Sequence, residues 1–207
     1  MKRCIIFSAS KIESYKKINI NICSGDYIIC ADGGYLHAKA LGIKPHLLIG
    51  DFDSLAIAPD DDVKTEKYPA EKDDTDTMLA IKNGFKNGCD EFLIIGGLGG
   101  ELHHILANIQ SLKYALDRNA KAVLEDDKNT VEMINCGSRI LNKSDGELVS
   151  LFAYSPKCEG LSIKGVKYPL ERVVLDNAFP LGVSNKITDE FATVTVENGD
   201  LLIVVTK

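Results

Sequence analysis

Several features that mark special classes of protein are missing from this chain of 207 residues. No apolar run reaches the roughly 18 residues of a membrane-spanning helix. The apolar start at Cys4–Phe7 is too short for the core of a signal peptide. No dense run of Lys and Arg is present and the formal net charge is −6, which argues against a nucleic-acid-binding face. We therefore expect a cytoplasmic protein with no membrane and no nucleic-acid partner.

The chain also lacks a C-x-x-C pair, the spacing that many zinc sites and redox motifs share. Its six cysteines are scattered: Cys4, Cys23, Cys30, Cys89, Cys136 and Cys158. We predict that they are free thiols in a reducing compartment. Hydrophobic residues make up 45% of the chain, an ordinary share for a soluble globular protein with a buried core.

In the first part of the chain, apolar strand-like runs alternate with segments of helical periodicity. The predicted strands are Cys4–Phe7, Tyr27–Ala31, His46–Ile49, Glu91–Ile95 and Lys121–Leu124. The predicted helices are Tyr35–Leu41, Thr75–Lys86 and Leu102–Arg118. Strands that alternate with helices are typical of a parallel sheet covered by helices. We predict an α/β domain over residues 1–130.

The remainder of the chain, residues 131–207, shows short strand-like runs and no long helical pattern. The runs are Thr130–Ile134, Leu148–Tyr154, Leu161–Lys164, Arg172–Leu175, Phe191–Val196 and Leu201–Thr206. Turn residues such as Cys136-Gly137-Ser138 separate them, and Glu197-Asn198-Gly199-Asp200 predicts a hairpin between the last two. This part is predicted to be an antiparallel sandwich or barrel.

Two carboxylates follow directly on an apolar strand in Leu47-Leu48-Ile49-Gly50-Asp51-Phe52-Asp53-Ser54. If the extended conformation persists, Asp51 and Asp53 point to the same side. Ligands of parallel α/β sheets gather at the carboxyl ends of strands. Magnesium usually takes one or two carboxylates, with phosphates and water completing its shell. A magnesium site is the sharper interpretation of this motif, and an ordinary acidic turn is the alternative.

A second acidic cluster, Glu71-Lys72-Asp73-Asp74-Thr75-Asp76, opens a predicted helix. Asp73, Asp74 or Thr75 is expected to be the N-cap, because short polar side chains accept the first helical N–H groups. For Asp73 and Asp74 we favour this structural role. Asp76 stays open as a ligand, and Lys72 carries a charge that suits a phosphate.

Glycines cluster at two further predicted strand ends. Cys30-Ala31-Asp32-Gly33-Gly34 follows one strand, and Asp32 is either a further acid of the site or a helix cap. Ile94-Ile95-Gly96-Gly97-Leu98-Gly99-Gly100 follows another and precedes a helix, an arrangement suited to anions. It is neither a Walker P-loop nor a complete G-x-G-x-x-G. His103 and His104 stand at the start of that helix, where they could act as a general base or as ligands, or could simply cap the helix or be solvated. Asn108 follows four residues after His104 and lies on the same face of the helix.

Together these residues resemble the thiamine pyrophosphokinase family over nearly the whole chain. The first half contributes Asp32-Gly33-Gly34, Gly50-Asp51-Phe52-Asp53-Ser54, Lys72 with Thr75-Asp76, and Gly96-Gly97-Leu98-Gly99-Gly100 with His104 and Asn108. The second half contributes Val149-Ser150-Leu151, Gly165-Val166-Lys167-Tyr168-Pro169-Leu170, Gly182-Val183-Ser184-Asn185 and Asn198-Gly199-Asp200. Each motif alone is unspecific, but their order and spacing together are highly specific.

The resemblance implies a Rossmann-like parallel-sheet domain followed by a smaller all-β sandwich domain that binds thiamine. It implies transfer of the diphosphoryl group of ATP to the hydroxyl of thiamine, with release of AMP and with Mg²⁺ as cofactor. It also implies a homodimer, in which thiamine lies between the catalytic domain of one subunit and the β domain of the other.

Residue roles follow from the matched motifs. Asp51, Asp53 and Asp76 are expected to hold Mg²⁺, and Lys72 is expected to be catalytic. The expected nucleotide and substrate contacts are Asp32, Gly33, Gly34, Ser54, Thr75, Gly96, Gly97, Gly99, Gly100, His104 and Asn108, with Ser184 and Asn185 placing thiamine. Because the chain has no Trp, aromatic contacts with thiamine must come from Tyr, Phe or His.

The chain departs from the family pattern in two places. Where the family usually has Gly-Gly-Arg-x-Asp-His, this chain has Gly99-Gly100-Glu101-Leu102-His103-His104. Where an acid often follows Ser-Asn, it has Lys186. Two alternative functions therefore stay open. One is a diphosphokinase for another hydroxymethyl heterocycle such as a pterin, and the other is a catalytically weak thiamine- or nucleotide-binding homologue.

Overall fold

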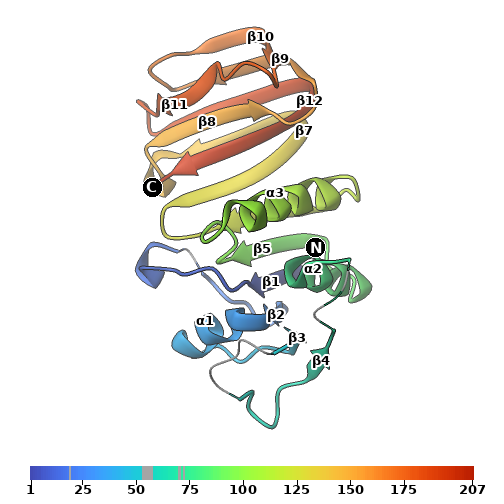
Figure 1. Ribbon diagram of the computed structural model, residues 1–207. Helices are drawn as coiled ribbons and strands as arrows, with labels where there is room; N and C mark the ends of the chain where they lie inside the picture. The colour runs from blue at the N-terminus through green and yellow to red at the C-terminus, as the bar shows by residue number, and fades with distance from the viewer. Residues whose placement is uncertain (19, 53–57, 70, 72) are drawn as a thin grey trace. The chain divides into compact units, whose positions relative to one another are not determined.

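The computed structural model describes residues 1–18, 20–52, 58–69, 71 and 73–207 (Figure 1). Its internal contacts divide the chain into two compact units, Met1–Asp127 and Lys128–Lys207. Each unit has a hydrophobic core of its own: Ile5, Phe7 and Leu48 belong to one core, and Val149 and Leu201 belong to the other.

The first unit is built on a parallel sheet. Its strands are β1 (Arg3–Phe7), β2 (Tyr27–Ala31), β3 (Leu47–Gly50), β4 (Thr65–Lys67), β5 (Glu91–Ile95) and β6 (Lys121–Glu125). They follow the order β6-β5-β1-β2-β3-β4, and each neighbouring pair is parallel. The chain runs outward from β1 to β4 and then returns to the other side of β1 with β5. The strand order therefore reverses beside β1, where sheets of this kind open a crevice at their carboxyl ends.

Helices cover both faces of this sheet. They are α1 (Tyr35–Ala40), α2 (Asp76–Lys86) and α3 (Leu102–Leu116), with short 3-10 turns η1 (Tyr15–Lys17) and η2 (Asp32–Gly34). Alternation along β1 sends Ile5 and Phe7 into the cluster that holds Tyr35 and Ala38 of α1. The opposite face meets α2, where Gly84 lies so close to β5 that a Cβ would be 2.5 Å from Phe92 Cε1. Figure 1 shows α2 and α3 side by side. Phe85 of α2 and Tyr114 of α3 meet edge to face, with their ring centroids 6.1 Å apart.

The second unit consists of antiparallel strands. They are β7 (Asn129–Asn142), β8 (Leu148–Ala153), β9 (Lys157–Lys164), β10 (Leu170–Asp176), β11 (Gly182–Lys186) and β12 (Phe191–Thr206), with the 3-10 turn η3 (Lys143–Asp145). The long β12 pairs with β7 along both of its halves. Its first half also pairs with β9 and its second half with β8, whose other edge pairs with β11. The buried core of this unit includes Leu161, Val194 and Ile203.

The expected hairpin at residues 197–200 is wrong. The strand runs on through Glu197, Asn198 and Gly199, which form a bulge between the pairs Val196↔Gly137 and Asp200↔Asn135. Gly199 has φ +98, a conformation that glycine adopts at low cost. The strand continues because β7 lies alongside both halves of β12 and pairs with it on either side of the bulge.

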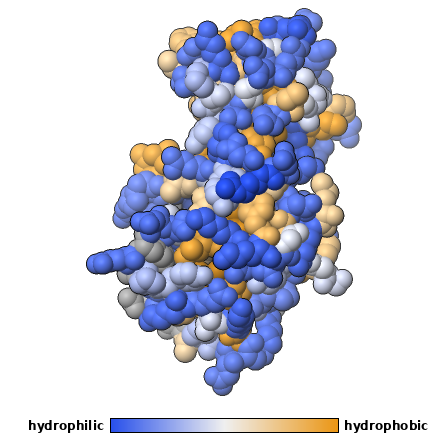
Figure 2. Space-filling view, turned by 90° about the vertical axis from the view of Figure 1, so that its right-hand side faces the viewer, coloured by the Kyte–Doolittle hydropathy of each residue, from blue (hydrophilic) through white to orange (hydrophobic). Residues whose placement is uncertain are grey.

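Most surface positions are hydrophilic on the face drawn in Figure 2, with apolar patches between them. Exposed apolar side chains of the second unit include Phe179, Leu181 and Val183, at 65%, 48% and 47% exposure. Within the described part of the chain, no helix is both long and apolar enough to cross a membrane.

Candidate active site

The segment after β1 joins three elements at the carboxyl edge of the parallel sheet. The backbone N–H of Ser8 donates to Ile95 O at 2.8 Å, which holds the segment against the end of β5. The Ser8 hydroxyl lies 2.9 Å from the hydroxyl of Thr77, in the first turn of α2. Because Asp76 is the neighbour of Thr77, this contact brings the acidic start of α2 to the end of β1.

The glycine-rich loop Gly96–Gly100 is fixed through its carbonyl groups. Ser10 donates its backbone N–H to Gly96 O at 3.0 Å and its hydroxyl to Gly99 O at 2.7 Å. The buried side-chain amide of Asn108, on α3, donates to Gly97 O at 2.8 Å. These bonds set the loop between the end of β1 and the following helix.

The backbone N–H groups of the same loop are available to a ligand. Among the described residues, no acceptor takes the N–H groups of residues 97–100. Successive amides of this kind, ahead of a helix N-terminus, form an anion-binding arrangement. Gly96 has φ +74, and a Cβ there would lie 2.6 Å from Ser8 O. Glycine is therefore required where the loop turns past the end of β1.

Two acids follow neighbouring strands at the same edge. Asp32 follows β2 with φ +47, and Asp51 follows β3. A Cβ on Gly50 would lie 3.1 Å from both Cα and Cβ of Asp32, so the last residue of β3 lies directly against Asp32. Asp32 and Asp51 are both half-buried. Their positions match the expectation that Asp32 and Asp51 lie at strand ends on one edge.

Gly33 and Gly34 bring the start of η2 close to β1. A Cβ on Gly33 would lie 3.1 Å from Ala9 Cβ, and one on Gly34 would lie 1.9 Å from Phe7 O. Cys30, near the end of the preceding strand β2, is buried, which raises the pKa of its thiol to about 12. The Cys30 thiol therefore stays protonated and is no nucleophile.

Thr75 is the N-cap of α2. Its side chain accepts a hydrogen bond from Met78 N at 3.1 Å, which resolves the three alternatives left open by the sequence. Asp74 forms an ion pair with Lys82 at 2.7 Å, and Asp73 is exposed. Asp76, half-buried in the first turn, is the acid of this cluster that suits a ligand role.

The start of α3 carries the residues that depart from the family pattern. Glu101 occupies the N-cap position without a side-chain capping bond, and its carboxylate lies 3.4 Å from His103 Nδ1. Both side chains are largely exposed, at 77% and 67%. The ring of His103 lies tilted against that of His104, with their centroids 4.3 Å apart. His104, expected to contact the nucleotide, is exposed at this end of the helix.

Asp53, Ser54 and Lys72 lie outside the described residues. Among the residues that are described, no three His, Cys, Asp or Glu side chains converge into a ready metal site. Asp51 and Asp76 nevertheless provide hard carboxylate oxygens from separate elements of one edge. One or two protein carboxylates with phosphate oxygens suffice for magnesium. The residues present therefore fit this cation.

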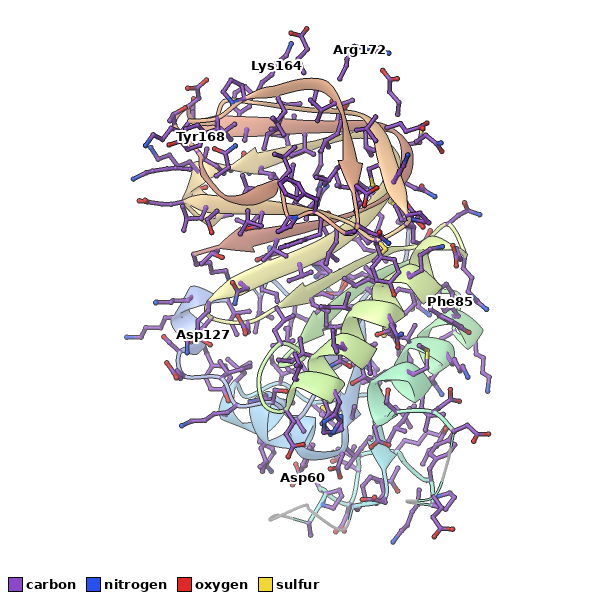
Figure 3. All side chains as sticks on the ribbon, turned by 45° about the horizontal axis from the view of Figure 1, so that its top comes forward. Asp60, Phe85, Asp127, Lys164, Tyr168 and Arg172 are labelled. Atoms are coloured by element: carbon purple, nitrogen blue, oxygen red, sulfur yellow. The ribbon has the colours of Figure 1, made fainter. Side chains whose placement is uncertain are left out.

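Ser184 and Asn185 lie on β11 in the second unit. The side-chain amide of Asn185 bonds the backbone of Tyr168 with both of its polar atoms: Nδ2 donates to Tyr168 O at 2.7 Å, and Oδ1 accepts from Tyr168 N at 3.0 Å. Ser184 has φ +55 and is exposed, and its N–H donates to Ser150 Oγ at 2.9 Å. Asn185 thus holds the segment of Tyr168, which is labelled in Figure 3 and is 62% exposed.

Sequence reasoning missed the segment Ser8–Ser10 and the acids after β6. Glu125, Asp126 and Asp127 are buried at the carboxyl end of β6, and Figure 3 labels Asp127. These acids could have been found by the pattern that indicated Asp51, namely polar residues directly after an apolar strand. His37 was missed as well, because nothing in its local pattern shows that it reaches the loop after β1.

The chain matches two family models. "Thiamin pyrophosphokinase, catalytic domain" covers residues 21–124, and "Thiamin pyrophosphokinase, vitamin B1 binding domain" covers residues 138–201. The thiamine pyrophosphokinase of Bacillus subtilis (strain 168) is 30% identical over 184 residues, 85% of each chain. Thiamin pyrophosphokinase 1 of Caenorhabditis elegans is 22% identical over 174 residues, 78% of this chain and 72% of that protein.

Solved structures resemble the chain over its full length. The crystal structure of thiamine pyrophosphokinase from Bacillus subtilis superposes with a TM-score of 0.89 at 25% identity, covering 100% of this chain and 99% of that one. A thiamin pyrophosphokinase family protein from Enterococcus faecalis gives a TM-score of 0.80 at 25% identity, with the same coverage. The similarity extends over both units.

Proposed function

Because the chain belongs to the thiamin pyrophosphokinase family, we propose that ATP and thiamine react at the carboxyl edge of its parallel sheet. The chain is a diphosphotransferase that moves the diphosphoryl group of ATP to thiamine, giving thiamine diphosphate and AMP. The observation that carries the placement is the segment Ser8–Ser10, which joins the glycine-rich loop to the start of α2. The edge also lies where the strand order reverses.

The nucleotide half of the proposal rests on the loop Gly96–Gly100. The N–H groups of residues 97–100 are suited to ATP phosphates, and the carbonyl groups of the loop are fixed by Ser10 and Asn108. We assign nucleotide contacts to Gly96, Gly97, Gly99 and Gly100, with Asp32, Gly33, Gly34 and His104 at the same edge. Asn108 and Thr75 act indirectly, because one holds Gly97 and the other caps α2. In this proposal the first unit serves as a Rossmann-like domain.

Asp51, Asp53 and Asp76 are proposed to hold Mg²⁺. A bound Mg²⁺ neutralises charge on the phosphates and fixes their position. The protein provides half-buried carboxylates from the end of β3 and the start of α2. Lys72 and Ser54 are assigned to phosphate contacts from the sequence motif alone.

The reaction itself is an in-line attack of the thiamine hydroxyl on the β-phosphorus of ATP, with AMP as the leaving group. Such transfers depend on positioning and charge neutralisation more than on covalent catalysis. The role of the chain is therefore to align two substrates and to exclude water. No general base is assigned.

The second unit is proposed to be a β-sandwich domain that places thiamine, over residues 131–207. Ser184 is exposed next to apolar Val183, and Asn185 acts by holding Tyr168. We propose that the chain works as a homodimer with a shared active site. The exposed Phe179, Leu181 and Val183 support this, because apolar clusters of this kind mark interaction surfaces. The cytoplasm is the proposed location.

The test is AMP release with thiamine as acceptor. Asp51→Asn removes one charged oxygen and should lower kcat by about a hundredfold or more, because several kcal/mol of charge stabilisation are lost. Asp61→Asn, at an exposed position, is the matched control and should keep full activity. Full activity of Asp51→Asn with magnesium would refute the metal assignment. A fully active monomer in sedimentation would refute the shared site.

A further inference from the structure

We propose that His37 is a positioning residue for the nucleotide, acting through Ser10 on the loop Gly96–Gly100. This inference rests on the proposed function, because it takes that loop to be the ATP site. His37 belongs to α1, and neither the motifs nor the family match singles it out.

The imidazole of His37 connects two segments through its two nitrogens. Nε2 lies 3.0 Å from the carbonyl oxygen of Ser10, and Nδ1 lies 2.7 Å from the hydroxyl of Tyr15. A carbonyl only accepts, so Nε2 carries the proton and donates to Ser10. In the neutral ring Nδ1 then accepts from Tyr15. The rings of Tyr15 and His37 meet edge to face at 5.8 Å, which fixes the imidazole further.

Ser10 is the residue through which this contact reaches the nucleotide loop. Its carbonyl is held by His37, while its N–H and hydroxyl hold Gly96 O and Gly99 O. The imidazole also packs directly against the loop, since a Cβ on Gly96 would lie 3.4 Å from His37 Cδ2. A shift of Ser10 therefore moves two loop carbonyls together, and with them the N–H groups between.

Burial makes the contact hard to replace by water. His37 is 8% exposed, and desolvation lowers its pKa below the usual value, which keeps the ring neutral near neutral pH. Removing the donor leaves the Ser10 carbonyl short of a partner in a confined place. The loop then samples positions that bind phosphate less well.

The experiment compares His37→Leu with His37→Gln. Leucine keeps an apolar side chain but has no donor, whereas the amide nitrogen of glutamine reaches to the place of Nε2. His37→Leu should raise the KM for ATP about tenfold, with an unchanged KM for thiamine. His37→Gln should restore most of the affinity. Tyr15→Phe removes only the hydroxyl and should raise the KM for ATP by about threefold.

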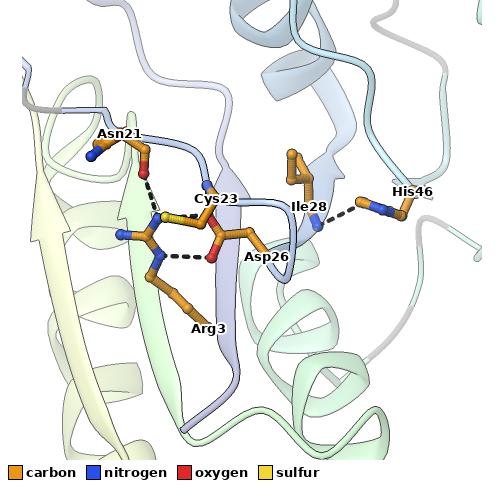
Figure 4. A network of polar contacts seen from close by, with 6 residues as sticks. All are labelled: Arg3, Asn21, Cys23, Asp26, Ile28 and His46. Carbon is orange, nitrogen blue, oxygen red and sulfur yellow. Dashed lines mark hydrogen bonds and ion pairs between the residues drawn. The ribbon is translucent and has the colours of Figure 1, made fainter.

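The matched control is His46→Leu. His46 also bonds the backbone through its ring, accepting from Ile28 N at 3.1 Å, but at the start of β2 rather than at the carboxyl edge (Figure 4). It should leave the KM for ATP unchanged. An equal rise in His46→Leu, or no rise in folded His37→Leu, would overturn the role of His37. If His37→Leu does not fold, an unchanged KM for ATP in Tyr15→Phe, measured against His46→Leu, counts against the proposal.

Hydrogen exchange separates this inference from the function that it rests on. A non-hydrolysable ATP analogue should protect the amides of residues 96–100 in the unaltered protein. Protection without a KM effect in His37→Leu overturns the His37 inference alone. Absence of protection overturns both, because the loop is then not the nucleotide site.

Discussion

The side-chain amide of Asn108 lies 2.8 Å from the carbonyl oxygen of Gly97 and donates to it across the start of α3. Asn108 is 7% exposed, so this bond is formed away from bulk water. The resemblance implied a nucleotide contact for Asn108, whereas in the structure its side chain holds the loop Gly96–Gly100. Its effect on the nucleotide is then indirect, through the position of Gly97.

Asn108→Asp should weaken both the fold and nucleotide binding. A carboxylate cannot donate to Gly97 O, and two oxygens would face each other in a buried place. We expect the free energy of unfolding to fall by about 1–3 kcal/mol, together with a higher KM for ATP. Gln110→Glu makes the same chemical change at an exposed position of α3 and is the control. Unchanged urea unfolding and kinetics in Asn108→Asp would contradict this role.

Gly34→Ala should be strongly destabilising. Its Cβ would lie 1.9 Å from Phe7 O, closer than any atoms can pack, so η2 and the end of β1 must separate. Overpacking of this kind costs about 1–3 kcal/mol, and more where backbone has to move. Gly25→Ala is the control, because nothing lies within 4 Å of its Cβ. Thermal unfolding of the two variants measures the difference, and equal midpoints would refute the packing argument.

Much of the first unit could be predicted from local pattern. Helix α2 was expected over Thr75–Lys86 and spans Asp76–Lys86, because its apolar period and its capping residue are both local. The strand Thr65–Lys67 was missed because it has no apolar run and lies exposed at the edge of the sheet. The contacts of Ser10 with Gly96 and Gly99 were also out of reach, since they join segments far apart in the sequence.

The second unit shows the limit of turn signals. Cys136-Gly137-Ser138 and Asn198-Gly199-Asp200 were both interpreted as turns between strands, yet both lie within continuous strands, β7 and β12, that pair with each other. Cys136, Gly137 and Gly199 have positive φ values, a conformation that occurs both in tight turns and at bulges. Whether a strand folds back or continues depends on its distant partner. Here β7 and β12 pair on both sides of the bulge, which no local pattern could reveal.

The ion pair of Arg3 with Asp26 should make stability depend on pH. The Arg3 guanidinium, hydrogen-bonded to the carboxylate, holds the pKa of Asp26 below its usual value (Figure 4). A carboxyl with a depressed folded pKa stabilises the fold above its unfolded pKa, and this contribution is lost as pH falls through the folded value. Asp26→Asn should therefore lower the free energy of unfolding at neutral pH by about 2 kcal/mol. The difference should vanish in acid.

Urea unfolding over a pH series measures this effect. Asp60→Asn, which breaks the exposed pair with Lys39, is the control and should change stability much less, because solvent screens such pairs. Figure 3 labels Asp60 on the first unit. A pH-independent difference between Asp26→Asn and the unaltered chain would show that the carboxylate charge does not contribute to folding.

Glu101 and His103 stand where the family pattern has Arg and Asp, and the structure shows them paired with each other in solvent. Their atoms approach to 3.4 Å, and both side chains are mostly exposed. The Glu101 side chain is therefore solvated rather than packed into the glycine-rich loop. A carboxylate near a triphosphate still opposes its binding, although solvent and salt screen the effect.

The enzyme should therefore be active, but less so than relatives with the usual pair. The double variant Glu101→Arg with His103→Asp replaces the Glu101 carboxylate by a positive charge and gives it a carboxylate partner at residue 103. We expect a lower KM for ATP or a higher kcat, measured by AMP release with thiamine. Asp61→Asn, which also raises the net charge by one unit at another exposed position, should alter neither. An inactive double variant would mean that the start of α3 makes a different substrate contact, in which Glu101 and His103 themselves take part.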